Sequence, residues 1–266
     1  MNKLEALHPV TLSGLKRLAK HRSKHDGIAL TTAQNLVAKT LGFRNYHYAR
    51  SAFNIKKLKL HPIEIRHRWE DDQTGAKGIE TLIFCLYASL TELPIKRVGS
   101  LPRCEGMRRG SNKFIARYPA SSRDSARMLA SQIARTLQFV DASGLIPAHV
   151  RPSQELSRKA NYHGVDHETF WQDPDTGFVL MVDEPYEVVA AKKEDEQNTE
   201  RYKFCSTHGL DYEIPEWSGI YFPEGGCGCY LVSEQGYRKF LDLILKRLAD
   251  YMPVITTANG NFISSD

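Results

Sequence analysis

The chain has 266 residues and a net charge of +5, which suits one large domain or a small domain joined to a larger one. No apolar run approaches the roughly 20 residues that cross a bilayer, and the N-terminus lacks the hydrophobic core of a secretion signal, so we expect a cytosolic protein. The five cysteines are odd in number and irregularly spaced, which argues against a disulfide-stapled secreted fold.

The positive charge is concentrated at the start of the chain. Residues 1–68 contain 14 Lys and Arg against 3 Asp and Glu, whereas the other 198 residues contain 22 against 28. The net charges are therefore +11 and −6. A cationic segment of this kind attracts an anionic partner, most often nucleic acid, although acidic proteins and anionic lipid respond to the same Coulomb force.

Three short helices are predicted in the basic segment. An apolar face predicts the first from 11 to 25, with Gly27 after its end. Thr31 and Gln34 have the spacing of a capping box for a second helix from 32 to 41. Gly42 and Asn45 then suit a turn into a third helix that ends near 54. The predicted core of this module is Leu12, Leu15, Leu18, Leu36, Leu41 and Phe53.

The second and third helices have the spacing of a helix-turn-helix. If Tyr46, Ala49 and Phe53 are buried, polar side chains that bond base edges remain on the outer face, and the neighbouring cations suit phosphates. The predicted nucleic-acid-binding residues are Lys39, Arg44, His47, Arg50, Ser51, Asn54, Lys56 and Lys57. The alternative is a protein-docking helical module whose polar face is only solvated.

Residues 31–46, Thr-Thr-Ala-Gln-Asn-Leu-Val-Ala-Lys-Thr-Leu-Gly-Phe-Arg-Asn-Tyr, allow a resemblance to be named. With the basic helix before them, they resemble a helical module at the front of uncharacterised bacterial proteins, several of them carried on plasmids and other mobile elements. Some relatives of that module precede glyoxalase-like domains. The resemblance covers about residues 10–55 and is weaker beyond, where the chain is similar to a bacterial family of unknown function. It implies a mobile-element setting and brings no catalytic residue.

Alternating and continuous apolar patterns predict an α+β body after residue 59. In its first half we expect strands at 63–69, 79–87 and 114–118, the first two forming a hairpin. A helix capped by Ser121 or Ser122 follows and ends at Gly144. The segment from 96 to 113 contains Arg97, Arg103, Arg108 and Arg109, and we favour a solvated loop over a second anion contact.

The second half repeats this order, so a duplicated unit is one interpretation. We expect strands at 168–172, 178–182, 219–222 and 229–232, and a helix capped by Ser233 with a broad apolar stripe from Tyr237 to Leu248. Residues 147–161 are predicted to be a connector and 192–200 a solvated segment. The chain is polar from Pro253 onward, and we expect its last few residues to be mobile. Helices would cover one face of an antiparallel sheet.

Zinc is the one cofactor for which ligands can be proposed. Cys205, His208, Cys227 and Cys229 are ligand types suited to a tetrahedral site. The Cys-Gly-Cys pair is a poor geometry for one ion, however, and the glycines around it equally suit a tight turn. No cofactor is therefore our main prediction, with zinc as the alternative.

Other chemical patterns are weak. His163, His167 and Glu168 have a spacing that metal hydrolases use on a helix, but Gly164 and the strand pattern that follows argue against a helix. Asp183 and Glu184 are interpreted as turn and surface residues. Trp217, Tyr221, Phe222 and Tyr230 would suit base stacking, but no Lys or Arg lies between residues 217 and 230, so we expect sheet core.

Two units are therefore predicted, a basic helical module at 1–58 and an α+β body at 59–266. The first hypothesis is a DNA-binding accessory or regulatory protein of a bacterial mobile element. The second is a non-catalytic adaptor whose cationic module docks on an acidic protein partner. A metal-dependent enzyme is the third. No membrane partner is expected.

Overall fold

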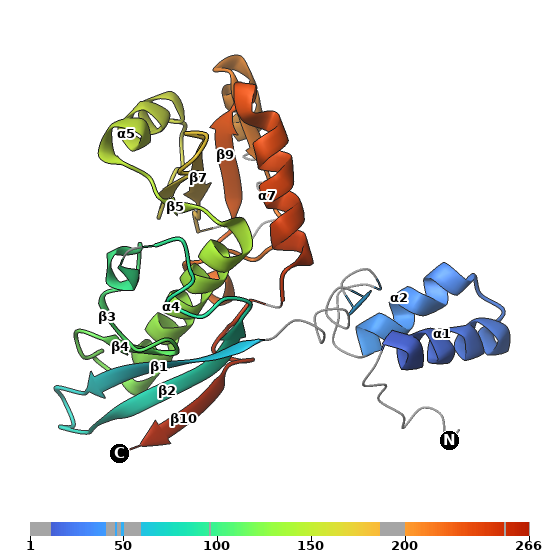
Figure 1. The fold of residues 1–266 in the computed structure, drawn as a ribbon, viewed down its shortest axis with the longest axis horizontal. Helices are drawn as coiled ribbons and strands as arrows, with labels where there is room; N and C mark the ends of the chain where they lie inside the picture. The colour runs from blue at the N-terminus through green and yellow to red at the C-terminus, as the bar shows by residue number, and fades with distance from the viewer. Residues whose placement is uncertain are drawn as a thin grey trace. The chain divides into compact units, whose positions relative to one another are not determined.

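The computed structural model describes residues 12–40, 46, 49–50, 60–95, 97–186, 200–252 and 254–265. The chain divides into two compact units. The first, which we call the head, comprises residues 1–59 and 250–252, and the second, the body, comprises residues 60–249 and 253–266. The fold is α+β, as predicted, with helices near the N-terminus and a body built on two five-stranded sheets (Figure 1).

Two helices of the head pack against each other. They are α1 (Leu12–Asp26) and α2 (Leu30–Thr40). Tyr46, Ala49 and Arg50 are also helical, and Ala49 adds to the same core. The fully buried residues of this core are Leu15, Ala19, Ala33, Val37, Ala38 and Ala49. Because most of them are small, the helices approach closely and the core has little volume.

Two predictions in the head are wrong. Leu36 is 37% exposed rather than buried, because Ala33 and Val37 define the inner face of α2 and Leu36 is rotated away from them. Thr31 lies inside α2, which starts at Leu30, so it does not cap the helix. The predicted turn at 42–45 and most of the third helix lie outside the described residues, as do Leu41 and Phe53.

The first sheet has the strand order β10-β2-β1-β4-β3. Its strands are β1 (His61–Glu70), β2 (Lys77–Leu86), β3 (Gly106–Arg109), β4 (Lys113–Ala116) and β10 (Asn261–Ser265). The predicted β1–β2 hairpin is confirmed, with Asp71 accepting hydrogen bonds from the N–H groups of Gln73 and Thr74 in the turn. β4 pairs with β1 in parallel and with β3 antiparallel.

Two elements of this sheet were not predicted. β3 lies within the segment that we interpreted as a solvated loop, where Arg108 and Arg109 conceal the strand pattern. β10 lies in the tail that we predicted to be mobile, and it pairs antiparallel with β2. Its sequence is polar because an edge strand has one exposed face and one unpaired edge.

The long helix α4 (Arg123–Ser143) packs on the first sheet and begins and ends as predicted. The Ser122 Oγ accepts the Ser125 N–H at 3.1 Å, and Gly144 ends the helix with φ of 76°. The helix is buried on more than its apolar face, however. Its buried polar residues are Ser131, Gln132, Arg135, Thr136, Gln138 and Ser143. These residues look like a solvated face in the sequence, but in the structure they lie inside the body.

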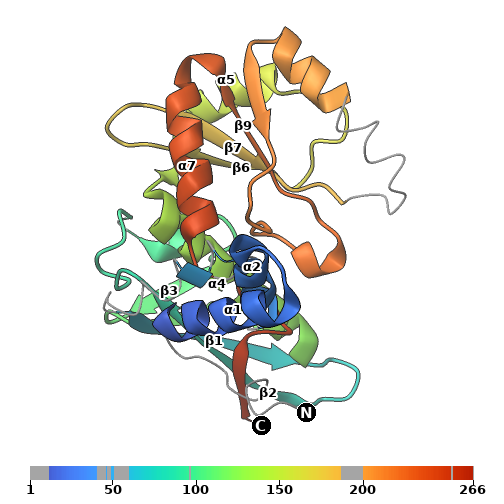
Figure 2. The same ribbon diagram turned by 90° about the vertical axis from the view of Figure 1, so that its right-hand side faces the viewer.

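The second sheet is antiparallel throughout, with the order β5-β6-β7-β9-β8. Its strands are β5 (Ile146–Pro147), β6 (Thr169–Gln172), β7 (Val179–Asp183), β8 (Leu210–Glu213) and β9 (Tyr230–Glu234). Helix α7 (Arg238–Asp250) lies beside this sheet (Figure 2), with its Phe240 ring stacked on that of Phe178 at 5.7 Å. The predicted apolar stripe of this helix is confirmed.

Helices contact both faces of the second sheet, not one face as predicted. Leu180 and Val182 of β7 join the core that contains α4 and α7, whereas Met181 joins a second core with Leu156 of α5 (Val150–Lys159). The connector that we predicted at 147–161 is thus mainly this helix. The helical residues 200–207 add Cys205 to the second core.

Two further predictions in the second half are wrong. Residues 219–222 form a loop, not a strand, and Ser233 is buried in β9 rather than capping α7. The two halves also differ in topology, because only the first sheet contains a parallel pair. None of the described helices is long and apolar enough to cross a bilayer.

Candidate functional site

The head presents a row of exposed cations along α1. Lys16, Lys20 and Lys24 follow one another at intervals of four residues and therefore lie along the same side of the helix. Arg17 is also exposed, whereas Arg22 pairs with Asp26, with 3.1 Å between Nε and Oδ2. Asp26 is the only acidic residue between positions 12 and 40. The positive potential of α1 is thus only slightly neutralised within the helix.

Two of the predicted nucleic-acid-binding residues are described, and both are exposed. Lys39 lies in the last turn of α2, where a cation interacts favourably with the helix dipole. Arg50 is helical and exposed beside the buried Ala49. The other six, Arg44, His47, Ser51, Asn54, Lys56 and Lys57, lie outside the described residues.

The four predicted zinc ligands are not brought together. Cys205 is in the core beside α5, whereas Cys229 is in the core shared by α4 and α7, and His208 is exposed with its ring stacked on Phe204. Within the described ranges, no three His, Cys, Asp or Glu side chains form a group able to hold a metal ion. Burial also raises the pKa of the Cys205 thiol to about 12 and that of Cys227 to about 11, which disfavours the thiolates that zinc requires.

The structure corrects our interpretation of Asp183 and Glu184, because both carboxyl groups are fully buried. Burial raises the pKa of Glu184 to about 7, although its Oε1 accepts hydrogen bonds from the Tyr221 and Ile220 N–H groups. Burial likewise raises the pKa of Asp183 to about 6, although the Tyr162 hydroxyl donates to it at 2.6 Å. Two adjacent carboxyl groups therefore change protonation close to neutral pH.

Gly219 permits the close approach of the loop to Glu184. Its φ is 101°, and a Cβ at this position would lie 2.5 Å from the Glu184 Oε1. A larger residue would therefore push the Ile220 and Tyr221 N–H groups away from the carboxylate.

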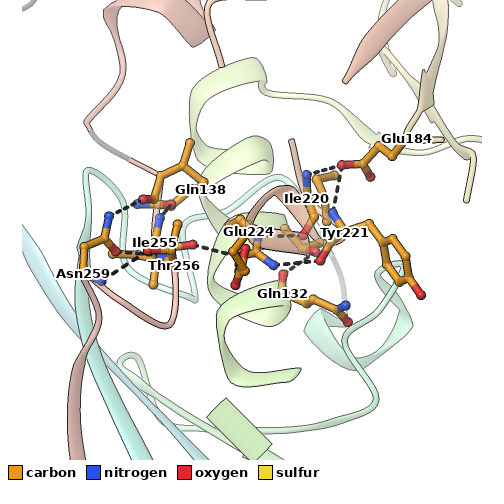
Figure 3. A network of polar contacts seen from close by, with 12 residues as sticks. Gln132, Gln138, Glu184, Ile220, Tyr221, Glu224, Ile255, Thr256 and Asn259 are labelled. Atoms are coloured by element: carbon orange, nitrogen blue, oxygen red, sulfur yellow. Dashed lines mark hydrogen bonds and ion pairs between the residues drawn. The ribbon is translucent and has the colours of Figure 1, made fainter. Parts of the chain in front are cut away.

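Arg135 of α4 connects the same loop to the segment before β10. Its side chain is fully buried and donates to the carbonyl oxygens of Ile220 at 2.7 Å, Tyr221 at 2.7 Å and Ile255 at 2.9 Å. The Glu224 carboxylate lies 3.1 Å from Nη1 and compensates the buried charge. Figure 3 shows Ile255 on one side of this network and Ile220 with Tyr221 on the other. Arg135, the one charged residue between Met128 and Val140, thus joins α4 to the loop at 220–224 and to the segment before β10 from inside the body.

Arg103 and His167 meet around the Tyr221 ring. The Arg103 Cζ lies 4.1 Å from the ring centroid, the His167 centroid lies 3.8 Å from it, and Arg103 Nη2 donates to the His167 carbonyl at 3.1 Å. They are also the only two non-glycine residues in the described part of the chain with positive φ, at 60° and 54°. Such strained residues persist where their surroundings fix them, so this contact holds the loop after β2 against the loop before β6.

The sequence concealed this contact. Arg103 supplies the cation that is missing between residues 217 and 230, but it does so from more than 100 residues away. His167 is not on a helix, so the pairing with His163 that a metal hydrolase would use is not formed. A pocket of about 440 Å³ lies next to His167, with His163, Asp166, Tyr186 and Arg201 among its lining residues. Its lining combines charged side chains with aromatic rings.

The chain was compared with protein-family models, with curated proteins and with solved structures, and none of the three comparisons gave a match.

Proposed function

We propose that the protein is a nucleic-acid-binding accessory or regulatory protein of a bacterial mobile element and that the head contacts duplex DNA. The observation that supports this most is the charge of the head. Residues 1–59 contain 12 Lys and Arg but only two acidic residues, Glu5 and Asp26. The mobile-element setting is inferred only from the resemblance of residues 31–46.

The geometry of α1 suits contact with a phosphate backbone. Lys16, Lys20 and Lys24 are exposed in a row that runs along the helix, so several phosphates can be neutralised together. Lys39 and Arg50 add exposed cations from α2 and from the helical residues that follow. Contacts of this kind supply affinity, whereas sequence preference requires side chains that reach base edges.

The proposal predicts a strong dependence of DNA affinity on salt. We expect the full chain to bind a 20-base-pair duplex in 50 mM KCl and to release it as KCl rises to 300 mM, as measured by fluorescence anisotropy. The variant K16Q/K20Q/K24Q removes three phosphate contacts. The slope of log affinity against log salt should therefore become shallower by about 2.7, at about 0.9 per contact.

The matched control is R151Q/R158Q/K203Q, which removes three exposed cations from the body. It should leave the slope for duplex DNA unchanged. Equal slopes for both variants, or binding that does not respond to salt, would contradict the proposal. Such a result would favour the adaptor hypothesis, in which the same cations contact an acidic protein.

A further inference from the structure

A cavity of about 300 Å³ lies in the body, beside the first sheet. It is lined by one residue of β1, three of α4, two of the segment before β3 and two of the segment after β4. These residues are His67, Leu129, Gln132, Ile133, Arg103, Glu105, Tyr118 and Pro119. The volume is at the small end of the range, about 300–1,000 Å³, in which proteins bind small molecules.

His67 is the polar exception in the buried row of β1, whose other members are Ile63, Ile65 and Trp69. The His67 side chain is only 5% exposed. Its Nδ1 lies 3.0 Å from the Arg68 carbonyl oxygen, which can only accept, so Nδ1 carries the proton. Burial lowers the pKa of the ring, which is therefore neutral at pH 7. Nε2 is left as a hydrogen-bond acceptor, without a partner in the described part of the chain.

Gln132 is the corresponding exception on α4. It is 4% exposed and lies on the side of the helix that carries Leu129 and Ile133. The side chains of Arg135 and Gln138, which are also buried, have hydrogen-bond partners. The side-chain amide of Gln132 has none among the described residues, and Figure 3 shows it apart from the dashed contacts of the Arg135 network. A donor and an acceptor therefore stand side by side without partners.

These two unpaired groups require an explanation, because buried polar groups in proteins are hydrogen-bonded in the great majority of cases. Leaving such a group without a partner costs stability. Neither the His67 Nε2 nor the Gln132 amide is sealed inside the packed core, and both residues line the cavity. Since the cavity is small, a single molecule inside it can bond to both.

The rest of the lining defines the chemistry of such a molecule. Arg103 and Glu105 have opposite charges, so the cavity favours neither an anion nor a cation. Leu129 and Ile133 supply an apolar wall, and Tyr118, which is 58% exposed, adds an aromatic ring at the border with solvent. A wholly apolar molecule would leave the imidazole and the amide unpaired. A fitting occupant is therefore neutral, with apolar faces and with donors and acceptors along an edge.

We propose that this cavity binds a nucleobase, with its edge on Gln132 and His67 and a face against the apolar wall of α4. A glutamine amide bonds to the adjacent donor and acceptor of a base, as it does with adenine in DNA. Proteins hold unpaired bases by such contacts together with stacking on aromatic rings, here that of Tyr118. The base can belong to a free nucleoside or to an unpaired nucleotide of a nucleic acid. The inference rests on the cavity and is independent of duplex binding by the head.

The test measures the binding of adenosine, guanosine, cytidine and uridine to the full chain by isothermal titration calorimetry. Ribose 5-phosphate is the control ligand, because it has the sugar and a phosphate but no base. We expect saturable binding of at least one nucleoside and none of ribose 5-phosphate. In Q132L and in H67F the affinity for that nucleoside should fall by about tenfold, because each variant lacks one of the two polar contacts.

The same variants distinguish a ligand contact from a structural role. Leucine at position 132 leaves no unpaired amide, so thermal unfolding of Q132L should occur at the midpoint of the unmodified protein or above it. The matched control is Q154L, at an exposed glutamine of α5, and it should retain the nucleoside affinity. A lower midpoint of Q132L with unchanged nucleoside affinity would assign Gln132 to the fold and overturn the inference.

Competition identifies the source of the base. Displacement of the nucleoside by a 12-nucleotide single strand, but not by a duplex whose bases are paired, would assign the cavity to nucleic acid. Failure of the single strand to displace it would assign the cavity to free nucleosides. K16Q/K20Q/K24Q should lose duplex affinity and retain nucleoside binding, so a failure of the head is distinguishable from a failure of the cavity.

Three further results would overturn the inference. The first is the absence of saturable binding for all four nucleosides. The second is an equal affinity in Q132L, H67F and Q154L. The third is competition by ribose 5-phosphate as strong as that by the nucleoside, because the base would then not be the part that is recognised.

Discussion

Arg135 is the residue on which three separate parts of the body depend. A guanidinium has five N–H donors in a planar fork, and here they join α4 to the 220–224 loop and to the segment before β10. A lysine has the charge but cannot donate in these directions together. The position therefore requires arginine for its geometry as well as for its charge.

We expect Arg135→Met to lower the free energy of unfolding by roughly 3–5 kcal/mol, because three carbonyl oxygens and the Glu224 carboxylate lose their partner. Arg135→Lys should lie between this variant and the unmodified protein. Urea unfolding followed by circular dichroism measures both. The control is Arg151→Met, at a side chain that is 90% exposed, and it should leave the midpoint unchanged. Equal midpoints for the two methionine variants would exclude an anchoring role.

Glu184 makes stability depend on pH in a direction that is unusual for a carboxyl group. Its pKa in the folded protein, about 7, lies above its ordinary value of 4.5, so the folded state holds the proton more tightly than the unfolded state. The stabilisation is fully present below pH 4.5 and is lost as pH rises to 7. At 1.36 kcal/mol per pKa unit, the loss is on the order of 3 kcal/mol.

Glu184→Gln should remove this part of the pH dependence, because an amide oxygen still accepts the Ile220 and Tyr221 N–H groups but does not titrate. Urea unfolding at intervals from pH 4.5 to 8 measures the effect. Asp183→Asn serves as comparison, since it should flatten a lower interval, from 3.8 to about 6. A Glu184→Gln curve parallel to that of the unmodified protein would contradict the assignment.

The sequence revealed the candidate residues of the head but not those of the body. Lys39 and Arg50 could be selected because a run of cations is visible without any structure. Arg103, Arg135 and Glu184 could not, because a charged residue has the same appearance in a sequence whether it is exposed or buried. Their roles arise from partners that are distant along the chain.

At the scale of elements, local signals located α1, α2, α4, α7 and the β1–β2 hairpin. Each has a cap, an apolar stripe or a turn within its own sequence, as Ser122 and Gly144 illustrate for α4. β3, β8, β10 and α5 lack such signals. These segments take up their regular structure through contacts with their partners instead. The polar segment after Pro253, for example, forms a strand only because the edge of β2 is available for pairing.

β10 should contribute strongly to stability despite its exposed side chains. It supplies a row of backbone hydrogen bonds to β2, and its Ser264 accepts from Arg127, which also pairs with the buried Glu80 at 2.8 Å. Deletion of residues 261–266 should therefore lower the thermal midpoint by several degrees. It should also promote aggregation through the edge of β2, as measured by light scattering.

The control for the deletion is Ile263→Thr with Ser265→Thr, which retains the strand and its backbone bonds while removing an exposed apolar group. This variant should unfold close to the unmodified midpoint and remain free of aggregates. Equal thermal midpoints and equal light scattering for the deletion and the control would show that β10 does not stabilise the sheet.

At the scale of the molecule, charge is divided more finely than the composition suggests. The sequence separates a basic start from an acidic remainder, and that division led us to assign polyanion contact to the start alone. The alternation of side chains along the strands then separates charge a second time within the body, because it places cations of β1, β3 and β4 on one face of the first sheet. A count over a whole segment cannot detect this, because residues on opposite faces of a sheet are neighbours in the sequence.

The pairing of Thr81 with Ile263 has a consequence for how the body comes to be folded. About 180 residues separate these two positions, and the whole second sheet is synthesised between them. Closing so long a loop is slow, since its entropy is lost before the contacts form. During synthesis on the ribosome, the edge of β2 in the β1–β2 hairpin therefore stays unpaired until the second sheet and β10 have emerged. We expect the nascent chain to need chaperones most during this interval.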